Sequence, residues 1–240
     1  MPVLASAIAV ITVIVGAAYF DRVTNLALGL ADLFGISSSP SNTLRRGVII
    51  NKEIAERQVV SVAFCDAGER HVARYHPGGD DFSWPCASRL FDLCVNASNS
   101  AEAVDYLDPV LTRFNAKVGH AVFFGHGSPA KQRIGRALVQ PTLLELLKNR
   151  RATDFIPQIS FYGCEVAMGE DGLKYIQHVA DAYRYNTLAM ADTVSWHVYS
   201  RDETTPCNFT INTEEIYLAT PDGNLAQKFK VPDEREDPCR

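Results

Sequence analysis

Short apolar runs alternate along this chain with segments in which apolar residues recur at helical spacing. Four runs are rich in β-branched and aromatic side chains and are bounded by glycine or polar residues: 58–65 (QVVSVAFC), 121–124 (AVFF), 159–162 (ISFY) and 187–191 (TLAMA). Runs of this length and composition are typical of buried β-strands. The pattern therefore predicts four core strands.

Helical periodicity fills much of the sequence between these runs. Residues 88–95 and 101–114 have apolar side chains at helical spacing, and Ser100 is the expected N-cap of the second helix. A proline at the start of 141–149 and an apolar stripe over 172–185 predict two further helices. Strands and helices in alternation indicate an α/β protein with a mostly parallel central sheet between helical layers.

The pattern changes after the last of these strands. Residues 196–199 and 209–212 are short alternating segments, which predict a β-hairpin near the C-terminus. We expect four parts along the chain: 1–20, an apolar membrane anchor or signal segment; 21–46, a linker; 47–225, the globular domain; and 226–240, a charged tail.

The N-terminal segment leaves the location of the protein open. Residues 3–20 are apolar and uncharged, which is close to the roughly 20 residues that a membrane-spanning helix needs. Small residues at 16–18 suit a signal-peptide cleavage site, although no Lys or Arg precedes the apolar stretch. A helix buried against protein is the third interpretation. We expect a membrane-anchored or secreted protein, with membrane association through residues 3–20.

Composition excludes several other functions. A net charge of −5 and an isoelectric point near 5.7 argue against nucleic acid as a partner. The sequence has no CxxC pair and no histidine spacing typical of zinc ligands, so we expect no metal site. It also lacks a glycine-rich nucleotide-binding motif, and we expect no cofactor.

Two of the predicted strands end at residues that can carry out catalysis. The run at 121–124 leads into Gly-His126-Gly, and the run at 159–162 leads into Gly-Cys164. The carboxyl ends of parallel strands meet at one edge of a sheet, where ligand sites form. A cysteine thiolate is a nucleophile, and an imidazole can activate it and protonate a leaving amine. The two motifs therefore predict a Cys–His catalytic pair.

These motifs, GHGS at 125–128 and FYGCEVA at 161–167, resemble those of the caspase-like cysteine peptidases of clan CD. The resemblance is closest to the bacterial caspase-like domains of large surface proteins and to the autoprocessing cysteine protease domains of bacterial toxins. It implies a caspase-like three-layer sandwich over residues 47–225, with a C-terminal hairpin or flap. It also implies a cysteine endopeptidase that hydrolyses a protein or peptide, with Cys164 as nucleophile and His126 as base.

The same resemblance implies further site residues. The backbone N–H groups of Gly127 and Cys164 would form the oxyanion hole that holds the developing alkoxide. Four side chains are candidate substrate-binding residues: Ser128, Glu165, Asp192 and Trp196.

Two of these candidates, Glu165 and Trp196, also have a plainer structural interpretation. Glu165 could line a pocket for a basic side chain or could be an exposed glutamate at a strand end. Asp192 ends the strand that follows the nucleophile, where clan members often place specificity residues. Trp196 and His197 could border the substrate groove or could pack within an ordinary hairpin.

Other charged and titratable residues receive weaker interpretations. Arg133 and Arg136 follow the histidine loop and could bind an acidic P1 side chain or a phosphate-rich activator, but solvated loop charges are the commoner explanation. We assign no role to His120, expected at the opposite end of its strand, or to His178, expected on a helix surface.

The six cysteines allow more than one pairing. If Cys164 is a free nucleophile, five remain, and five cannot all pair within one chain. Cys65 falls in an apolar run, as a small buried hydrophobe would. Two pairs could form disulfides in an oxidising compartment, although spacing alone does not prove them: Cys86 with Cys94, and Cys207 with Cys239.

Two other functional hypotheses remain open from the sequence. The chain could be a non-catalytic caspase-like module that uses the same edge for binding or anchoring. Alternatively, the motifs could be coincidental in an unrelated α/β protein. The catalytic hypothesis requires the strands that end at His126 and Cys164 to be adjacent and parallel, and the sheet order tests this.

Overall fold

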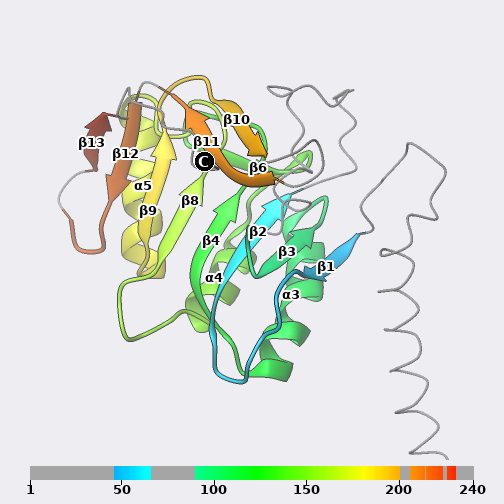
Figure 1. Cartoon of the computed structure of the whole chain (residues 1–240). Helices are drawn as coiled ribbons and strands as arrows, with labels where there is room; N and C mark the ends of the chain where they lie inside the picture. The colour runs from blue at the N-terminus through cyan, green and yellow to red at the C-terminus, as the bar shows by residue number, and fades with distance from the viewer. Residues whose placement is uncertain (1–45, 66–89, 201–205, 214, 224–225, 231–240) are drawn as a thin grey trace, which may run out of the picture. The chain divides into compact units, whose positions relative to one another are not determined.

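The computed structural model describes most of the chain beyond its first 45 residues (Figure 1). The described ranges are 46–65, 90–200, 206–213, 215–223 and 226–230. They belong to the second of two compact units, residues 43–240. The expected apolar segment at 1–20, most of the expected linker, Cys86 and Cys239 lie outside the described residues. Within the described part, no helix is long and apolar enough to cross a membrane.

An eight-stranded sheet forms the centre of the described structure, in the order β1-β3-β2-β4-β8-β9-β12-β13. Its strands are β1 (Gly47–Ile50), β2 (Val59–Cys65), β3 (Leu93–Asn96), β4 (Lys117–Phe123), β8 (Gln158–Phe161), β9 (Asn186–Met190), β12 (Glu215–Ala219) and β13 (Gln227–Lys230). The five strands from β3 to β9 are parallel, and the outer strands β1, β12 and β13 pair antiparallel. The predicted α/β class with a mostly parallel sheet is therefore confirmed.

Within the described ranges, three helices cover one face of this sheet: α3 (Ser100–Phe114), α4 (Pro141–Asn149) and α5 (Gly169–Tyr183). Each lies in a crossover between parallel strands, and the strand order advances in one direction from β3 through β4 and β8 to β9. Right-handed crossovers that advance in one direction place their helices on the same face. Figure 1 shows all three behind the sheet. Leu107, Leu147 and Ile176, one from each helix, share a single core with the sheet.

The start of α3 differs from the prediction by one residue. Asn99, and not Ser100, is the N-cap: its side chain accepts a hydrogen bond from the Glu102 N–H at 3.0 Å. Ser100 is buried, and its hydroxyl accepts a hydrogen bond from the Gln140 N–H at 2.9 Å. That contact joins the start of α3 to the residue before α4.

Two parts of the sheet depart from the sequence prediction. Residues 93–96 form the buried strand β3, so the helix predicted over 88–95 is wrong for this part. Burial on both faces produces a continuous apolar run, which periodicity alone does not distinguish from a helix. The sheet also continues beyond the expected domain end at residue 225, because β13 pairs with β12.

The opposite face of the sheet carries a smaller apolar cluster. On the helical face, Phe123 packs between Phe64 and Phe161, with ring centroids 4.6 and 5.3 Å away. On the opposite face, Phe91 and Tyr162 flank Phe124 at 5.8 and 5.4 Å. No helix in the described ranges covers this second face, so those ranges contain two of the three predicted layers.

A hairpin leaves the sheet between two paired strands. β10 (Ser195–Ser200) and β11 (Pro206–Asn212) pair antiparallel, which confirms the predicted C-terminal hairpin. They lie in sequence between β9 and β12, and those two strands pair directly with each other. In Figure 1 the hairpin is drawn at the edge where the arrowheads of β2, β4 and β8 end.

Candidate active site

The strands that lead to His126 and Cys164 are neighbours in the sheet. β4 and β8 pair in parallel, and Phe123 is in register with Phe161. Both motif loops therefore begin at the same level of the same edge. The adjacency required by the catalytic hypothesis is present.

Glycine backbones bring the two loops into contact. A Cβ added to Gly163 would lie 2.8 Å from both the Cα and the nitrogen of Gly127. A Cβ added to Gly127 would lie 2.5 Å from the carbonyl oxygen of Cys164. Neither position has room for a side chain, so the glycines in both motifs are explained by close backbone approach.

Cys164 is half-buried in the turn after β8, and its sulfur faces a third loop. The backbone N–H of Val194 donates a hydrogen bond to Sγ over 3.5 Å. This hydrogen bond fixes the position of the sulfur beside the loop between β9 and β10. Among the cysteines whose side chains are described, Cys164 is the only free one.

Of the two other cysteines whose side chains are described, Cys94 was predicted as a disulfide partner of Cys86, and Cys65 was predicted to be unbonded. Cys65 and Cys94 are each disulfide-bonded, and the 3.3 Å between their two Sγ atoms is too long for a bond joining them to each other. The interpretation of Cys65 as a simple buried hydrophobe is therefore wrong. Both residues are fully buried at the ends of neighbouring strands, β2 and β3.

The two backbone N–H groups predicted for the oxyanion hole, those of Gly127 and Cys164, have no hydrogen-bond acceptor among the described residues. The Arg133 N–H donates to the His126 carbonyl at 2.9 Å, so Gly127 and Gln132 form a non-hydrogen-bonded pair of their ladder. The Gly127 N–H therefore points away from that partner strand. The Cys164 N–H donates to no acceptor within the described ranges. Donors without an internal acceptor can stabilise a developing oxyanion.

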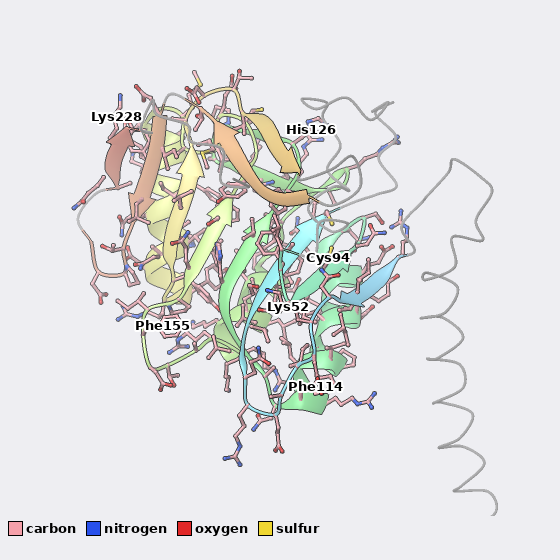
Figure 2. All side chains as sticks on the ribbon, viewed as in Figure 1. Lys52, Cys94, Phe114, His126, Phe155 and Lys228 are labelled. Atoms are coloured by element: carbon pink, nitrogen blue, oxygen red, sulfur yellow. The ribbon has the colours of Figure 1, made fainter. Side chains whose placement is uncertain are left out.

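His126 is held by a small meander that follows β4. The meander consists of β5 (Gly127–Ser128), β6 (Lys131–Ile134) and β7 (Ala137–Leu138), paired antiparallel in sequence. His126 is half-buried immediately before β5. Figure 2 places it at one end of the molecule, far from the labelled Phe114 and Phe155 at the opposite end.

The acidic candidates Glu165 and Asp192 lie beside Cys164. Glu165 is half-buried with a left-handed φ of 60°, and its N–H donates to the Asp192 carbonyl at 3.0 Å. The Asp192 carboxylate accepts a hydrogen bond from the Thr213 hydroxyl. The structure therefore brings Asp192 to the cysteine loop, as predicted, and Glu165 is not a fully exposed strand-end residue.

The remaining candidate residues have no described contact with Cys164. Ser128 is half-buried in β5, opposite Lys131, and no described contact joins it to Cys164. Trp196 is in β10, opposite Ile211 in the ladder. Lys131, Arg133 and Arg136 are exposed on the meander, and His178 is exposed on α5.

The prediction that His120 lies at the far end of its strand is wrong. His120 lies near the middle of β4. It lies on the sheet face opposite the helices, and its Nε2 is 3.0 Å from the Ser160 hydroxyl. Burial lowers the pKa of His120. Ser160 also accepts a hydrogen bond from the Gln158 amide at 2.8 Å. His120 therefore belongs to a partly buried polar network on the second face.

Sequence reasoning missed three residues of the site: Gln132, Val194 and Thr213. Gln132 is buried in β6, where exposed and buried residues alternate. The sequence does hold one indication of this burial. Side chains two residues apart share a face of a strand, so Gln132 lies on the same face as the apolar Ile134. Val194 contributes a backbone group, which leaves no signal in the identity of its side chain.

No group of three or more potential metal ligands is present in the described ranges. Comparisons of the chain with protein-family models, with curated proteins and with solved structures found no match.

Proposed function

We propose that this protein is a cysteine endopeptidase of caspase-like type, with Cys164 as the nucleophile and His126 as the general base and acid. The observation that carries the proposal is the backbone contact between Gly127 and Gly163. It joins the histidine loop to the cysteine loop at the carboxyl edge of two adjacent parallel strands. This is the edge at which α/β proteins form their ligand sites.

The proposed reaction has two stages. The Cys164 thiolate attacks the scissile carbonyl carbon, and the negative charge on the oxygen is stabilised by the N–H groups of Gly127 and Cys164. Collapse of this intermediate breaks the C–N bond, and His126 protonates the departing amine. His126 then takes a proton from water, the hydroxide oxygen attacks the thioester carbon, and the thiolate leaves.

The charges around the nucleophile favour a basic P1 side chain in the substrate. Asp192 lies in the loop that contacts the cysteine turn, and Glu165 adjoins Cys164. The exposed Arg133 and Arg136 favour an acidic P1 residue instead, but they lie on the meander after His126 and have no described contact with Cys164. The proposal therefore takes a peptide with Arg or Lys at P1 as the substrate.

A panel of acyloxymethyl ketone probes with Arg, Asp or Leu at P1 tests this function. We expect the Arg probe to label the full-length protein once, and peptide cleavage and labelling to disappear in Cys164→Ala. His126→Ala should lose activity to a similar extent, and the double variant should be barely worse than either single one, since the two residues act as one unit. His178→Ala, exposed on α5, is the matched histidine control and should retain activity.

The non-catalytic binding module is the alternative that this experiment separates. If no probe labels the folded protein, no peptide in a broad library is cleaved, and Cys164 resists alkylation, the endopeptidase proposal is wrong. The binding module then becomes the better hypothesis.

A further inference from the structure

Gln132 is a buried polar residue in a strand whose other polar side chains face solvent. It is 1% exposed, whereas its neighbours Lys131 and Arg133 are exposed. Both ends of its amide are hydrogen-bonded. Oε1 accepts a hydrogen bond from the Gly163 N–H at 2.9 Å, and Nε2 donates to the Arg133 carbonyl at 2.9 Å.

These bonds connect the two loops of the site. The Arg133 N–H donates to the His126 carbonyl at 2.9 Å, so a continuous path runs from His126 through Arg133 and Gln132 to Gly163. Gly163 directly precedes Cys164. The Gln132 backbone is also fixed, because its carbonyl accepts a hydrogen bond from the Val139 N–H at 2.9 Å. The side chain therefore extends from a paired strand to the cysteine turn.

The surrounding backbone leaves little freedom for this amide. A Cβ on Gly163 would lie 2.7 Å from Oε1 of Gln132. A Cβ on Gly125, the residue before His126, would lie 2.6 Å from the Arg133 carbonyl oxygen and 3.5 Å from Nε2 of Gln132. Glycines on both sides of the site thus make room for one glutamine side chain.

We propose that Gln132 is a positioning residue that fixes the Cys164 turn relative to the His126 loop. This inference rests on the proposed function for its effect on catalysis. The Gly163–Gln132 bond holds the Tyr162–Gly163 peptide, one peptide unit before the Cys164 N–H, and so restricts the turn that directs this N–H and places Sγ beside Val194. Misplacement of reacting groups by about 1 Å costs on the order of 10²-fold in rate.

The chemistry of the amide explains why this position requires glutamine. One end must accept from an N–H and the other must donate to a carbonyl. Methionine has a similar length and volume but cannot form these bonds. A glutamate carboxylate could accept from Gly163, but its second oxygen would face the Arg133 carbonyl. Protonation of that carboxyl restores the donor.

Gln132→Met in the full-length protein is the first test. We expect kcat to fall about 10²-fold with KM changed by less than about threefold. We also expect iodoacetamide to alkylate Cys164 several-fold more slowly, because the sulfur loses its fixed place beside the Val194 N–H, where the proposed site presents it for attack. Tyr185→Phe is the matched control: it removes one buried hydrogen bond, to the Leu147 carbonyl at 2.8 Å, outside the site. It should leave kcat and the alkylation rate unchanged.

Gln132→Glu provides a second test, because a role in packing alone would not make the effect of the substitution depend on pH. Its activity and alkylation rate, each divided by the wild-type value at the same pH, should rise as the pH falls and the introduced carboxyl gains a proton. A flat ratio overturns the proposal. Wild-type kinetics and alkylation in Gln132→Met also overturn it.

The experiment separates the failure of this inference from the failure of the proposed function. If the wild type cleaves peptides but Gln132→Met cleaves them equally well, the positioning role is wrong and the endopeptidase stands. If the wild type cleaves nothing, the endopeptidase is wrong. In that case the alkylation rates of Gln132→Met and the pH dependence in Gln132→Glu still decide whether Gln132 positions Cys164.

Discussion

Gly127 and Gly163 touch through their backbones, with no space for a side chain at either position: a Cβ on Gly163 would lie 2.8 Å from the Gly127 nitrogen. That nitrogen carries one of the two N–H groups proposed for the oxyanion hole. The contact therefore links the integrity of the two loops to the geometry of the proposed reaction.

Gly163→Ala should separate these loops. We expect peptidase activity to fall at least about 10-fold, because the added methyl must displace the Gly127 backbone or the Gln132 amide. Gly169→Ala is the control. Gly169 has a left-handed φ of 69° and nothing within 4 Å of an added Cβ, so alanine should cost about 1 kcal/mol of stability but leave kcat intact. Equal kcat in the two variants would contradict the prediction.

Asp192→Asn should lower kcat/KM for substrates with Arg at P1 by at least about 10-fold, since it removes the carboxylate charge proposed to face the substrate. Substrates with Leu at P1 should be cleaved nearly as before. Thr213→Val removes only the hydroxyl that donates to Asp192 and should show a smaller loss for the Arg substrate. Equal losses for the Arg and Leu substrates would assign Asp192 a structural role.

The pH dependence of stability should carry a contribution from His120. Burial lowers the pKa of this residue below its value in the unfolded chain. The unfolded state then takes up a proton first as the pH falls, so stability is lost on acidification from about pH 6.5 down to the folded-state pKa. His120→Gln has no group that titrates in this range, and its melting temperature should fall less between pH 7 and pH 5 than that of the wild type. An equal fall in melting temperature between pH 7 and pH 5 for the variant and the wild type would exclude this contribution.

Phe123→Ala should be among the most destabilising single substitutions in the sheet. Its ring is fully buried between Phe64 and Phe161, and emptying such a site costs about 3–5 kcal/mol. Phe155→Ala removes the same ring at a position that is 51% exposed and should cost less than about 1 kcal/mol. Urea denaturation of both variants measures the difference, and similar midpoints would contradict it.

Strong local patterns made much of the fold predictable. The apolar run at 159–162 and the proline at 141 are each decided by a few neighbouring residues, and β8 and α4 lie where they were expected. β3 was not predictable in this way, because its four buried residues suit a strand or a helix equally. The helix–strand choice there depends on β1 and β2, which pair with β3 from distant parts of the chain.

The candidate site was predictable where side-chain identity carries the chemistry. Cys164, His126 and Asp192 stand out as residue types at strand ends. Gln132 and Val194 do not, because the contact of Gln132 with Gly163 spans 31 residues in sequence and Val194 acts through its backbone. Such contributions depend on which loops the sheet brings together.

The direct pairing of β9 with β12 has a consequence for how firmly the end of the chain is held. Backbone pairs from Thr187–Ala219 to Met190–Ile216 join β9 directly to β12. The β10–β11 hairpin, which lies between these two strands in sequence, is therefore not needed to hold β12 and β13 in the sheet. A chain cut once between β10 and β11 would keep its last two strands through the backbone hydrogen bonds to β9. The two pieces would then copurify as one folded species and separate only when the sheet unfolds.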